Sequence, residues 1–471
     1  MSSTIKQQDM QQPAVETNVE ELLEKYDRES NYRKKLGVWA WVVTFLGVSL
    51  TVFHLYTAYF GSFQSQIQGA VHLGTALGLI FLLYPVKKGL QRKQTGVPWY
   101  DVVLAFVALF TCYYNVYHYE GLLQRTVFGY TTMDYVIATL GVLLVLEATR
   151  RCVGLPIVIV CLAAIAYALW GSGLPLLSHR GFSWSTLSTD LFFKTDGIFG
   201  IPIRVSSTFI FLFLFFGVML QRTGIGKYFT DLAFALTGRF SGGPAKAAVG
   251  ASALLGTITG SSIANTVSSG AFTIPMMKKA GYRPEFAGAT EASASTGGQF
   301  MPPVMGAAAF IMAEYTGIPY SEIIIYAIIP ACLYFAGVFF GVHFESKKYG
   351  ILGLAPEQLP KLGQLVVRQG YLLLPLFFII YMLVSGKTPM RAALIGILVA
   401  FLVSFINKET RMSIRDIINA LEEGARGALP VIAACASAGI IVGVVVLTGL
   451  GSKIGGGIIT LSGGILILTL F

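Results

Sequence analysis

The chain has 471 residues, of which 54% are hydrophobic and only 12% are charged, and its mean hydropathy is +0.67. Soluble domains of this size do not show this composition, and long apolar runs recur from residue 38 onward. We therefore expect an all-α polytopic membrane protein, because a β-barrel would show short segments of alternating polarity instead. The net charge of +10 does not indicate nucleic-acid binding, since the basic residues cluster in short loops that set membrane orientation.

The first 37 residues are polar and charged, and Arg33-Lys34-Lys35 stand directly before the first apolar run. Basic residues mark the cytoplasmic ends of membrane spans, so the segment 1–37 is expected to be cytoplasmic. The loop 61–68 carries no charge and is expected on the outer side. The segment 38–151 is then predicted to form a four-helix membrane unit, with spans at about 38–59, 69–86, 100–118 and 133–148.

After this unit, two more spans are predicted at about 153–170 and 205–221, with an interfacial aromatic stretch at 171–200 and an amphipathic connector at 226–240. The apolar stretch 244–277 has Lys246 near its start and Lys278-Lys279 just after its end. Basic residues at both ends favour a re-entrant hairpin that enters and leaves on the cytoplasmic side. Two arms of about twelve residues would each reach only about 18 Å, so the tip is expected inside the membrane.

A helix over 284–312 is expected to cross outward, with an interruption at Thr296–Pro303, and a run over 321–342 returns. The rest of the chain contains spans at about 371–385 and 389–406, an amphipathic stretch at 408–426, an apolar run at 428–449 and the glycine-rich stretch 449–457. The sequence ends at Phe471 within a further apolar run. Because a terminus in lipid would leave backbone groups unpaired, we expect the chain to be truncated at its C-terminus.

Both interrupted stretches combine glycines with hydroxyl and amide side chains, which is poor chemistry for an ordinary spanning helix. Unwound backbone at membrane depth is tolerated where protein or a watery cavity satisfies it, and such breaks form ion and solute sites in secondary transporters. The oxygens suit a small hard cation such as Na⁺. The alternative is close helix packing through small residues. The predicted cation-binding residues are Gly256, Gly260, Ser261, Ser262, Asn265, Thr296, Gly297 and Gly298.

The free N–H groups at the N-terminal ends of broken helices suit a carboxylate. The predicted residues for an anionic solute are Ser261, Gln299, Pro302 and Arg204. Arg204 begins an apolar helix near the predicted outer interface, so the alternative is that it extends to the headgroups without binding solute.

Glu291 is the acidic residue placed well inside the interrupted helix, about 12 Å beyond Arg283 at helical rise. An ionisable residue within a span is a functional candidate, and Glu291 is the predicted proton-coupling residue. The alternative is a carboxylate that faces an inner vestibule or pairs with Lys278 or Lys279.

Three stretches carry a resemblance to a known family, namely Thr259–Asn265 (TGSSIAN), Ile274–Tyr282 (IPMMKKAGY) and Ser293–Gly306 (SASTGGQFMPPVMG). They resemble the large membrane subunit of tripartite ATP-independent periplasmic (TRAP) transporters, and the nearest form is the fused permease of the TAXI branch. The segment 38–151, with Glu147-Ala-Thr-Arg-Arg151, resembles the small four-helix subunit fused in front.

The resemblance implies a bacterial or archaeal inner-membrane symporter that imports organic anions with Na⁺ or H⁺. C4-dicarboxylate, 2-oxoglutarate and glutamate are the implied solutes, and an extracytoplasmic solute-binding protein is the implied partner. It also implies an elevator-type scaffold with two inverted repeats. The segment 152–369 would be the first half of the transport domain, and 370–471 an incomplete second repeat whose hairpin is expected after about 450.

Other classes of function fit the sequence less well. No phosphate-binding loop of the form GxxxxGK[ST] occurs, which argues against an ATP-driven pump. The five cysteines lack metal-ligand spacing and are expected to be reduced packing residues. We therefore predict neither an enzyme nor a bound cofactor. A passive channel and a non-transporting assembly subunit remain the alternatives.

Overall fold

The computed structural model describes residues 32–87, 96–174 and 177–463, and this part of the chain is helical without strands. Nine of its helices are long and apolar enough to cross a membrane, as judged by length and composition. The expectation of an all-α polytopic membrane protein is therefore confirmed. Most of the segment 1–37 and of the loop that follows the second predicted span lies outside the described residues.

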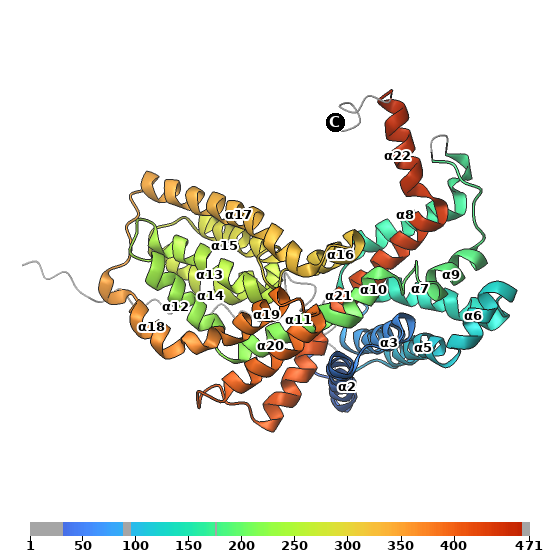
Figure 1. Cartoon of the computed structure of the whole chain (residues 1–471), viewed down its shortest axis with the longest axis horizontal. Helices are drawn as coiled ribbons and strands as arrows, with labels where there is room; N and C mark the ends of the chain where they lie inside the picture. The colour runs from blue at the N-terminus through green and yellow to red at the C-terminus, as the bar shows by residue number, and fades with distance from the viewer. Residues whose placement is uncertain (1–31, 88–95, 175–176, 464–471) are drawn as a thin grey trace, which may run out of the picture.

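One group of helices, here called the N-terminal body, gathers at one end of the molecule (blue through cyan to green in Figure 1). The start of α7 shows how local sequence sets an element, because Thr131 and Asp134 form a reciprocal capping box that satisfies free N–H groups. The body consists of α2 (Trp39–Phe60), α3 (Ser65–Leu83), α5 (Trp99–Tyr117), α6 (Tyr119–Phe128), α7 (Thr132–Cys152), α8 (Leu155–Trp170), η1 (Gly171–Gly173) and α9 (Trp184–Phe193).

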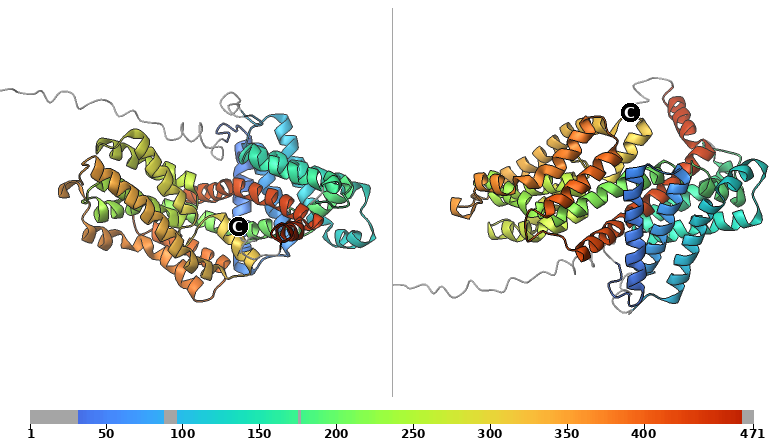
Figure 2. Two further views of the ribbon diagram at one scale, coloured as in Figure 1. Left: turned by 90° about the horizontal axis from the view of Figure 1, so that it is seen from above. Right: turned by 60° about the horizontal axis from the view of Figure 1, so that its bottom comes forward.

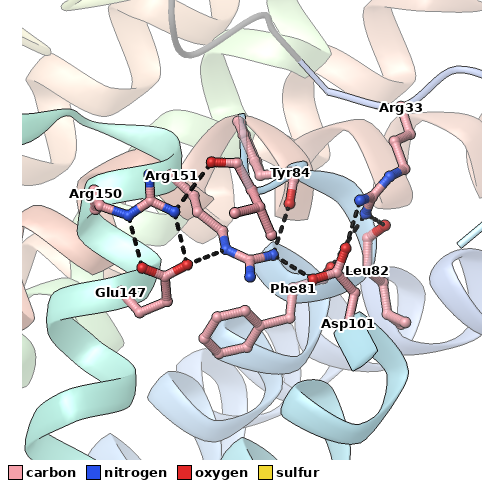
Figure 3. A network of polar contacts seen from close by, with 9 residues as sticks. Arg33, Phe81, Leu82, Tyr84, Asp101, Glu147, Arg150 and Arg151 are labelled. Carbon is pink, nitrogen blue, oxygen red and sulfur yellow. Dashed lines mark hydrogen bonds and ion pairs between the residues drawn. The ribbon is translucent and has the colours of Figure 1, made fainter. Parts of the chain in front are cut away.

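A buried ion network joins one end of three helices of this body to the segment before α2 (Figure 3). The Asp101 carboxylate at the start of α5 accepts hydrogen bonds from Arg33 at 2.5 Å and from Arg151 of α7 at 2.7 Å. Arg33 also donates to the Leu82 carbonyl at the end of α3. Because all three charged side chains are almost completely buried, the network fixes these helix ends relative to one another.

The remaining helices up to residue 404 form the other end of the molecule and the region between the two ends (Figure 1). They are α10 (Ile201–Val205), η2 (Ser206–Ile210), α11 (Phe211–Arg222), α12 (Ile225–Thr237), α13 (Gly243–Thr259), α14 (Ser262–Lys279), α15 (Pro284–Thr296), η3 (Gly297–Gln299), α16 (Ala307–Thr316), α17 (Tyr320–Lys348), η4 (Pro356–Gln358), α18 (Leu362–Gln369), η5 (Gly370–Leu373), α19 (Leu374–Val384) and α20 (Pro389–Ser404). Within this set, α13, α14, α15 and α17 share an apolar core of their own, which includes Ala248, Met277, Ala287 and Val342. We call these four helices the hairpin body.

The hairpin arms are longer than the sequence analysis predicts. They contain 17 and 18 residues, which corresponds to about 26 Å at the helical rise of 1.5 Å per residue. The prediction of about twelve residues was wrong because Gly250 and Gly256 do not end α13. Both glycines lie within the helix and face neighbouring elements closely, Gly250 against Ala233 and Gly256 against Gly298. Close packing of this kind favours small residues over strong helix formers.

A single helix, α21 (Ile414–Thr448), connects the two groups, and α22 (Leu450–Leu461) follows it. The sequence analysis predicts an amphipathic stretch separate from an apolar run here, but α21 continues through both for 35 residues, with Pro430 inside it. Its start is capped by Ser413 and Asp416. Both views of Figure 2 show α21 (red) reaching into the N-terminal body, where it packs on α2, α3, α7 and α8. Burial on several sides stabilises the helix despite the proline.

Candidate functional site

The turn between the hairpin arms is shaped by one glycine. Gly260 has a φ of 58°, a left-handed conformation that costs little only for glycine. A Cβ atom at this position would also overlap the Met305 carbonyl oxygen. The chain therefore leaves α13 at Thr259 and enters α14 at Ser262 within two residues, and the tip lies against the segment that follows the second break.

The second break lies directly beside the first arm of the hairpin. α15 ends at Thr296, and the helix resumes as α16 at Ala307 after η3 and an irregular segment. The Val304 N–H donates to the Thr257 carbonyl at 3.4 Å. The Tyr320 hydroxyl of α17 lies 2.8 Å from the Pro303 carbonyl oxygen and 2.7 Å from that of Val304. The two breaks, some forty residues apart in sequence, thus form one continuous piece of structure.

Glu291 lies at the centre of the hairpin body and is fully buried. Four hydroxyl groups donate hydrogen bonds to its carboxylate. They come from Ser252 of α13 at 2.8 Å, Ser269 and Thr273 of α14, the latter at 2.5 Å, and Ser295 of α15 at 3.1 Å. The site therefore joins both hairpin arms to the interrupted helix through one side chain.

Glu291 forms no ion pair within the described chain, and Lys278 and Lys279 are both exposed. The structure therefore contains no ion pair between Glu291 and either lysine. A buried carboxylate without a cationic partner depends on hydrogen bonds for its stabilisation. In its ionised form, this carboxyl group would carry a negative charge that a bound cation would balance.

Asn265 lies one helical turn before Ser269 and carries an unpaired oxygen. Its Nδ2 donates to the Ser252 carbonyl at 2.8 Å, which fixes the orientation of the amide. Its Oδ1 is buried and forms no hydrogen bond to any described residue, and the same holds for Thr259 Oγ1. An unsatisfied buried oxygen costs about 1–3 kcal/mol. Two such oxygens on either side of the hairpin turn are suitable ligands for a cation.

The other predicted cation residues lie around this centre in different environments. Gly256 and Gly298 are in close contact, since a Cβ on Gly256 would lie 2.6 Å from the Gly298 Cα. Gly297 is buried beside the ring of Phe335. The Thr296 hydroxyl donates back to the Ala292 carbonyl of its own helix and is exposed.

The predicted solute residues are only partly together. Gln299 donates to the Ser262 hydroxyl at 3.3 Å across the two breaks, on an exposed side. Ser261, in the turn, accepts the Asn265 N–H through its carbonyl at 3.0 Å. Pro302 lies elsewhere, in the wall of an apolar pocket of about 410 Å³ between the second break, α17 and α19.

Arg204 is engaged by an acidic partner. Its guanidinium forms an ion pair with Glu314 of α16, and the two side chains are 43% and 33% exposed. The pair connects α10 to the helix that follows the second break. Arg204 is therefore placed to hold α16, and it meets an anion only if Glu314 releases it.

The sequence analysis missed the four hydroxyl residues around Glu291. A signal was present, because Asn265, Ser269 and Thr273 recur at every fourth position and so share one face of α14. Ser295 stands four residues after Glu291 on the same principle. The position of Ser252 follows only from the pairing of the two arms, which no local pattern specifies.

Residues 140–471 match the family model described as the DctM component of tripartite ATP-independent periplasmic transporters. This match covers well over half of the chain. The chain belongs to this TRAP transporter family. The match begins within α7, so the resemblance of the preceding helices to a fused small subunit stays a prediction.

Curated relatives agree with the TRAP family. The chain is 31% identical to the "C4-dicarboxylate TRAP transporter large permease protein DctM" of Vibrio cholerae over 168 residues, which is 35% of this chain and 33% of the relative. It is 26% identical to the protein of the same name from Pseudomonas aeruginosa over 242 residues, 48% of this chain and 54% of the relative. An uncharacterized protein y4mL of Sinorhizobium fredii is 25% identical over 197 residues, 41% and 46% of the two chains. The chain thus spans about a third to a half of the length of these relatives.

Proposed function

We propose that this chain is a membrane component of a secondary symporter that imports organic anions together with Na⁺ or H⁺ and receives them from an extracytoplasmic solute-binding protein. The membership of the TRAP family and the nine apolar helices support a transporter component in a membrane. The observation that carries the proposal is the buried centre of the hairpin body. There, the buried Glu291 carboxyl group has no cationic partner among the described residues, and the buried Asn265 Oδ1 has no hydrogen-bond partner.

This centre supplies what an ion-coupled transporter needs. Na⁺ binds several oxygens, and Asn265 Oδ1 and Thr259 Oγ1 are of that type. When Glu291 is ionised, its negative charge favours cation entry. We propose Na⁺ as the coupling ion, and the alternative is a proton carried by Glu291.

An organic anion fits the adjacent break. The start of α14 at Ser262 presents backbone N–H groups and the positive end of a helix dipole. Gln299 contacts Ser262 there and can donate to a carboxylate. The names of two relatives specify C4-dicarboxylates, so we propose a dicarboxylate or a similar organic acid as the solute. Movement of the hairpin body against the rest of the protein, as in an elevator, and the TAXI type of binding protein belong to the same proposal.

A test of the cation site measures Na⁺-dependent stabilisation of the purified full-length protein. A ligand that binds only the folded state raises the free energy of unfolding by RT ln(1 + [L]/Kd), so the melting temperature should rise with NaCl and not with choline chloride. Asn265→Ala should abolish this rise. The matched control Asn407→Ala changes an exposed asparagine far along the chain and should keep it.

Transport gives the second readout of the proposed function. The protein is reconstituted in liposomes with its solute-binding protein and labelled succinate, and uptake is measured with and without an inward Na⁺ gradient. Uptake that requires both the gradient and the binding protein supports the symporter. Uptake that runs equally without either would show a passive channel. If NaCl stabilises unchanged protein and Asn265→Ala alike, the cation does not bind at Asn265.

A further inference from the structure

Two histidines and a serine form a hydrogen-bonded chain between the N-terminal body and the rest of the protein. His54 Nε2 of α2 lies 2.8 Å from His72 Nδ1 of α3, and His72 Nε2 lies 3.0 Å from the Ser206 hydroxyl. All three side chains are essentially inaccessible to solvent. Neither histidine belongs to the hairpin body, and the proposed transport site does not use them.

The series of hydrogen bonds from His54 through His72 ends at Ser206, which lies in an unusual piece of helix. Ser206 begins η2, a single π-helical turn between α10 and α11. Such turns disturb the regular backbone ladder and often occur at functional sites. The Ser207 carbonyl in this turn accepts a hydrogen bond from Gln68 of α3 at 2.7 Å, and Phe211 stacks on the His54 ring at 4.1 Å. The contact between α3 and the π-helical turn is therefore made of a few directional bonds.

The hydrogen bonds between His54, His72 and Ser206 can all be formed by two neutral rings. A neutral imidazole has one donor and one acceptor nitrogen, so protons can be arranged along His54, His72 and Ser206 in one consistent direction. His54 Nδ1 forms no hydrogen bond of normal geometry, and the backbone acceptor that lies toward the His54 ring is the Ser207 carbonyl, which accepts from Gln68. One additional proton on the pair would turn one ring into a cation.

No acidic group in the described part of the chain contacts either ring. The charged groups on the elements packed around the pair are engaged with each other or exposed. The Cys435 thiol of α21 lies beside Ser206. The ion pairs are those of Asp101 of α5 with Arg33 and Arg151, Arg204 of α10 with Glu314, Arg222 of α11 with Glu423, and Glu422 of α21 with Arg426. Arg391 of α20 and Arg415 of α21 are exposed, and Asp416 caps the start of α21. A buried cation without a counterion is strongly unfavourable. The closed contact therefore excludes the proton that water-exposed imidazoles would take up.

We propose that the His54–His72 pair is a proton-binding site that fills when the contact between α3 and the π-helical turn opens, so that acid loosens the junction of the N-terminal body with α10 and α11. The proton comes from solvent and is held on an imidazole nitrogen, and no covalent bond changes. Because Arg204 lies in the turn just before Ser206, the junction is adjacent to the ion pair with Glu314 of α16. Acid thereby acts on a helix that follows the second break.

Protonation can be followed directly because the chain has only five histidines. The full-length protein with ¹⁵N-labelled histidine in lipid nanodiscs gives ring nitrogen shifts, and replacement of His118, His179 and His343 in turn assigns the other two. We expect neutral rings with a shared hydrogen bond at pH 7.5. One ring of the pair should become cationic as the pH falls toward 5. Rings of His54 and His72 that stay neutral at pH 5 in folded protein would overturn the proposal.

Opening is measured by amide hydrogen exchange of residues 66–75 and 201–211. If one proton is bound on opening, the opening equilibrium should increase about tenfold for each pH unit below about pH 6.5, after correction for intrinsic exchange. The double variant His54→Gln/His72→Asn keeps polar groups but does not titrate, and it should lose this increase. His118→Gln should retain it. If the histidine pair is protonated but the amides of these two segments exchange no faster, protonation does not loosen the junction. This result would contradict the proposal, and it does not depend on whether the double variant folds.

Discussion

Gly256 of α13 and Gly298 of η3 touch through their backbones, so that a Cβ built on Gly298 would lie 2.9 Å from the Gly256 Cα. Real side chains do not approach backbone this closely. The contact brings the first arm of the hairpin against the interruption of the second helix, and Asn265 lies on the same side, with its Nδ2 3.4 Å from that Cβ position. The two glycines therefore determine how the oxygens of the two breaks face one another.

Gly298→Ala should destabilise the protein by about 1–3 kcal/mol, because the added methyl group overlaps backbone that cannot move independently. Gly288→Ala is a matched control in the neighbouring helix α15, where a Cβ meets nothing within 4 Å. It should be neutral or stabilise by roughly 0.5–1 kcal/mol. Thermal unfolding of the Gly298→Ala and Gly288→Ala proteins in the same detergent measures this difference. Equal melting temperatures would show that the contact between Gly256 and Gly298 does not constrain the fold.

Asp101→Asn should cost about 3–5 kcal/mol, because it leaves Arg33 and Arg151 buried without a full negative charge between them. Glu147→Gln serves as the comparison, since Glu147 binds Arg150 and Arg151 (Figure 3) but is 30% exposed. Its loss should cost about 1 kcal/mol or less. Denaturant unfolding measures both. An Asp101→Asn protein as stable as Glu147→Gln would mean that the arginines find other acceptors or water.

The sequence was sufficient for the parts of the fold that depend on local composition. Apolar runs predicted most spans, and Gly260 marked the hairpin turn because backbone conformation is a local property. The length of α13 and the continuity of α21 were missed, since both depend on packing partners that compensate for glycines or for Pro430. Glu291 was found as an acid inside an apolar helix. The hydroxyls from Ser252 and Thr273 that surround it come from other helices, and only tertiary structure places them together.

Exchanging the charges of Arg204 and Glu314 by mutation distinguishes a structural role of Arg204 from direct binding of the solute. If the ion pair only holds α10 to α16, either Arg204→Glu or Glu314→Arg alone should lower transport by juxtaposing like charges. The double variant Arg204→Glu/Glu314→Arg should then recover most of it. Succinate uptake and KM for the three proteins provide the measurement. Failure of the double variant to recover, with a raised KM, would instead support direct binding of the anion by Arg204.

The claim that the buried centre of the hairpin body couples ion and solute is tested most directly by Glu291→Gln. This change retains the size of the side chain but replaces the carboxyl group, which accepts four hydroxyl hydrogen bonds, with an amide that can neither ionise nor carry the coupling proton. Glu285→Gln changes an exposed acid at the start of the same helix and is the control.

Uptake of labelled succinate is measured in liposomes under a Na⁺ gradient and a pH gradient applied separately, together with solute exchange in the absence of both. For whichever gradient drives the unchanged protein, Glu291→Gln should reduce accumulation about tenfold or more, as expected for loss of an ionic interaction of 1.5–3 kcal/mol. Exchange should persist, and Glu285→Gln should behave as the unchanged protein does. Undiminished accumulation by Glu291→Gln under that gradient would contradict the account.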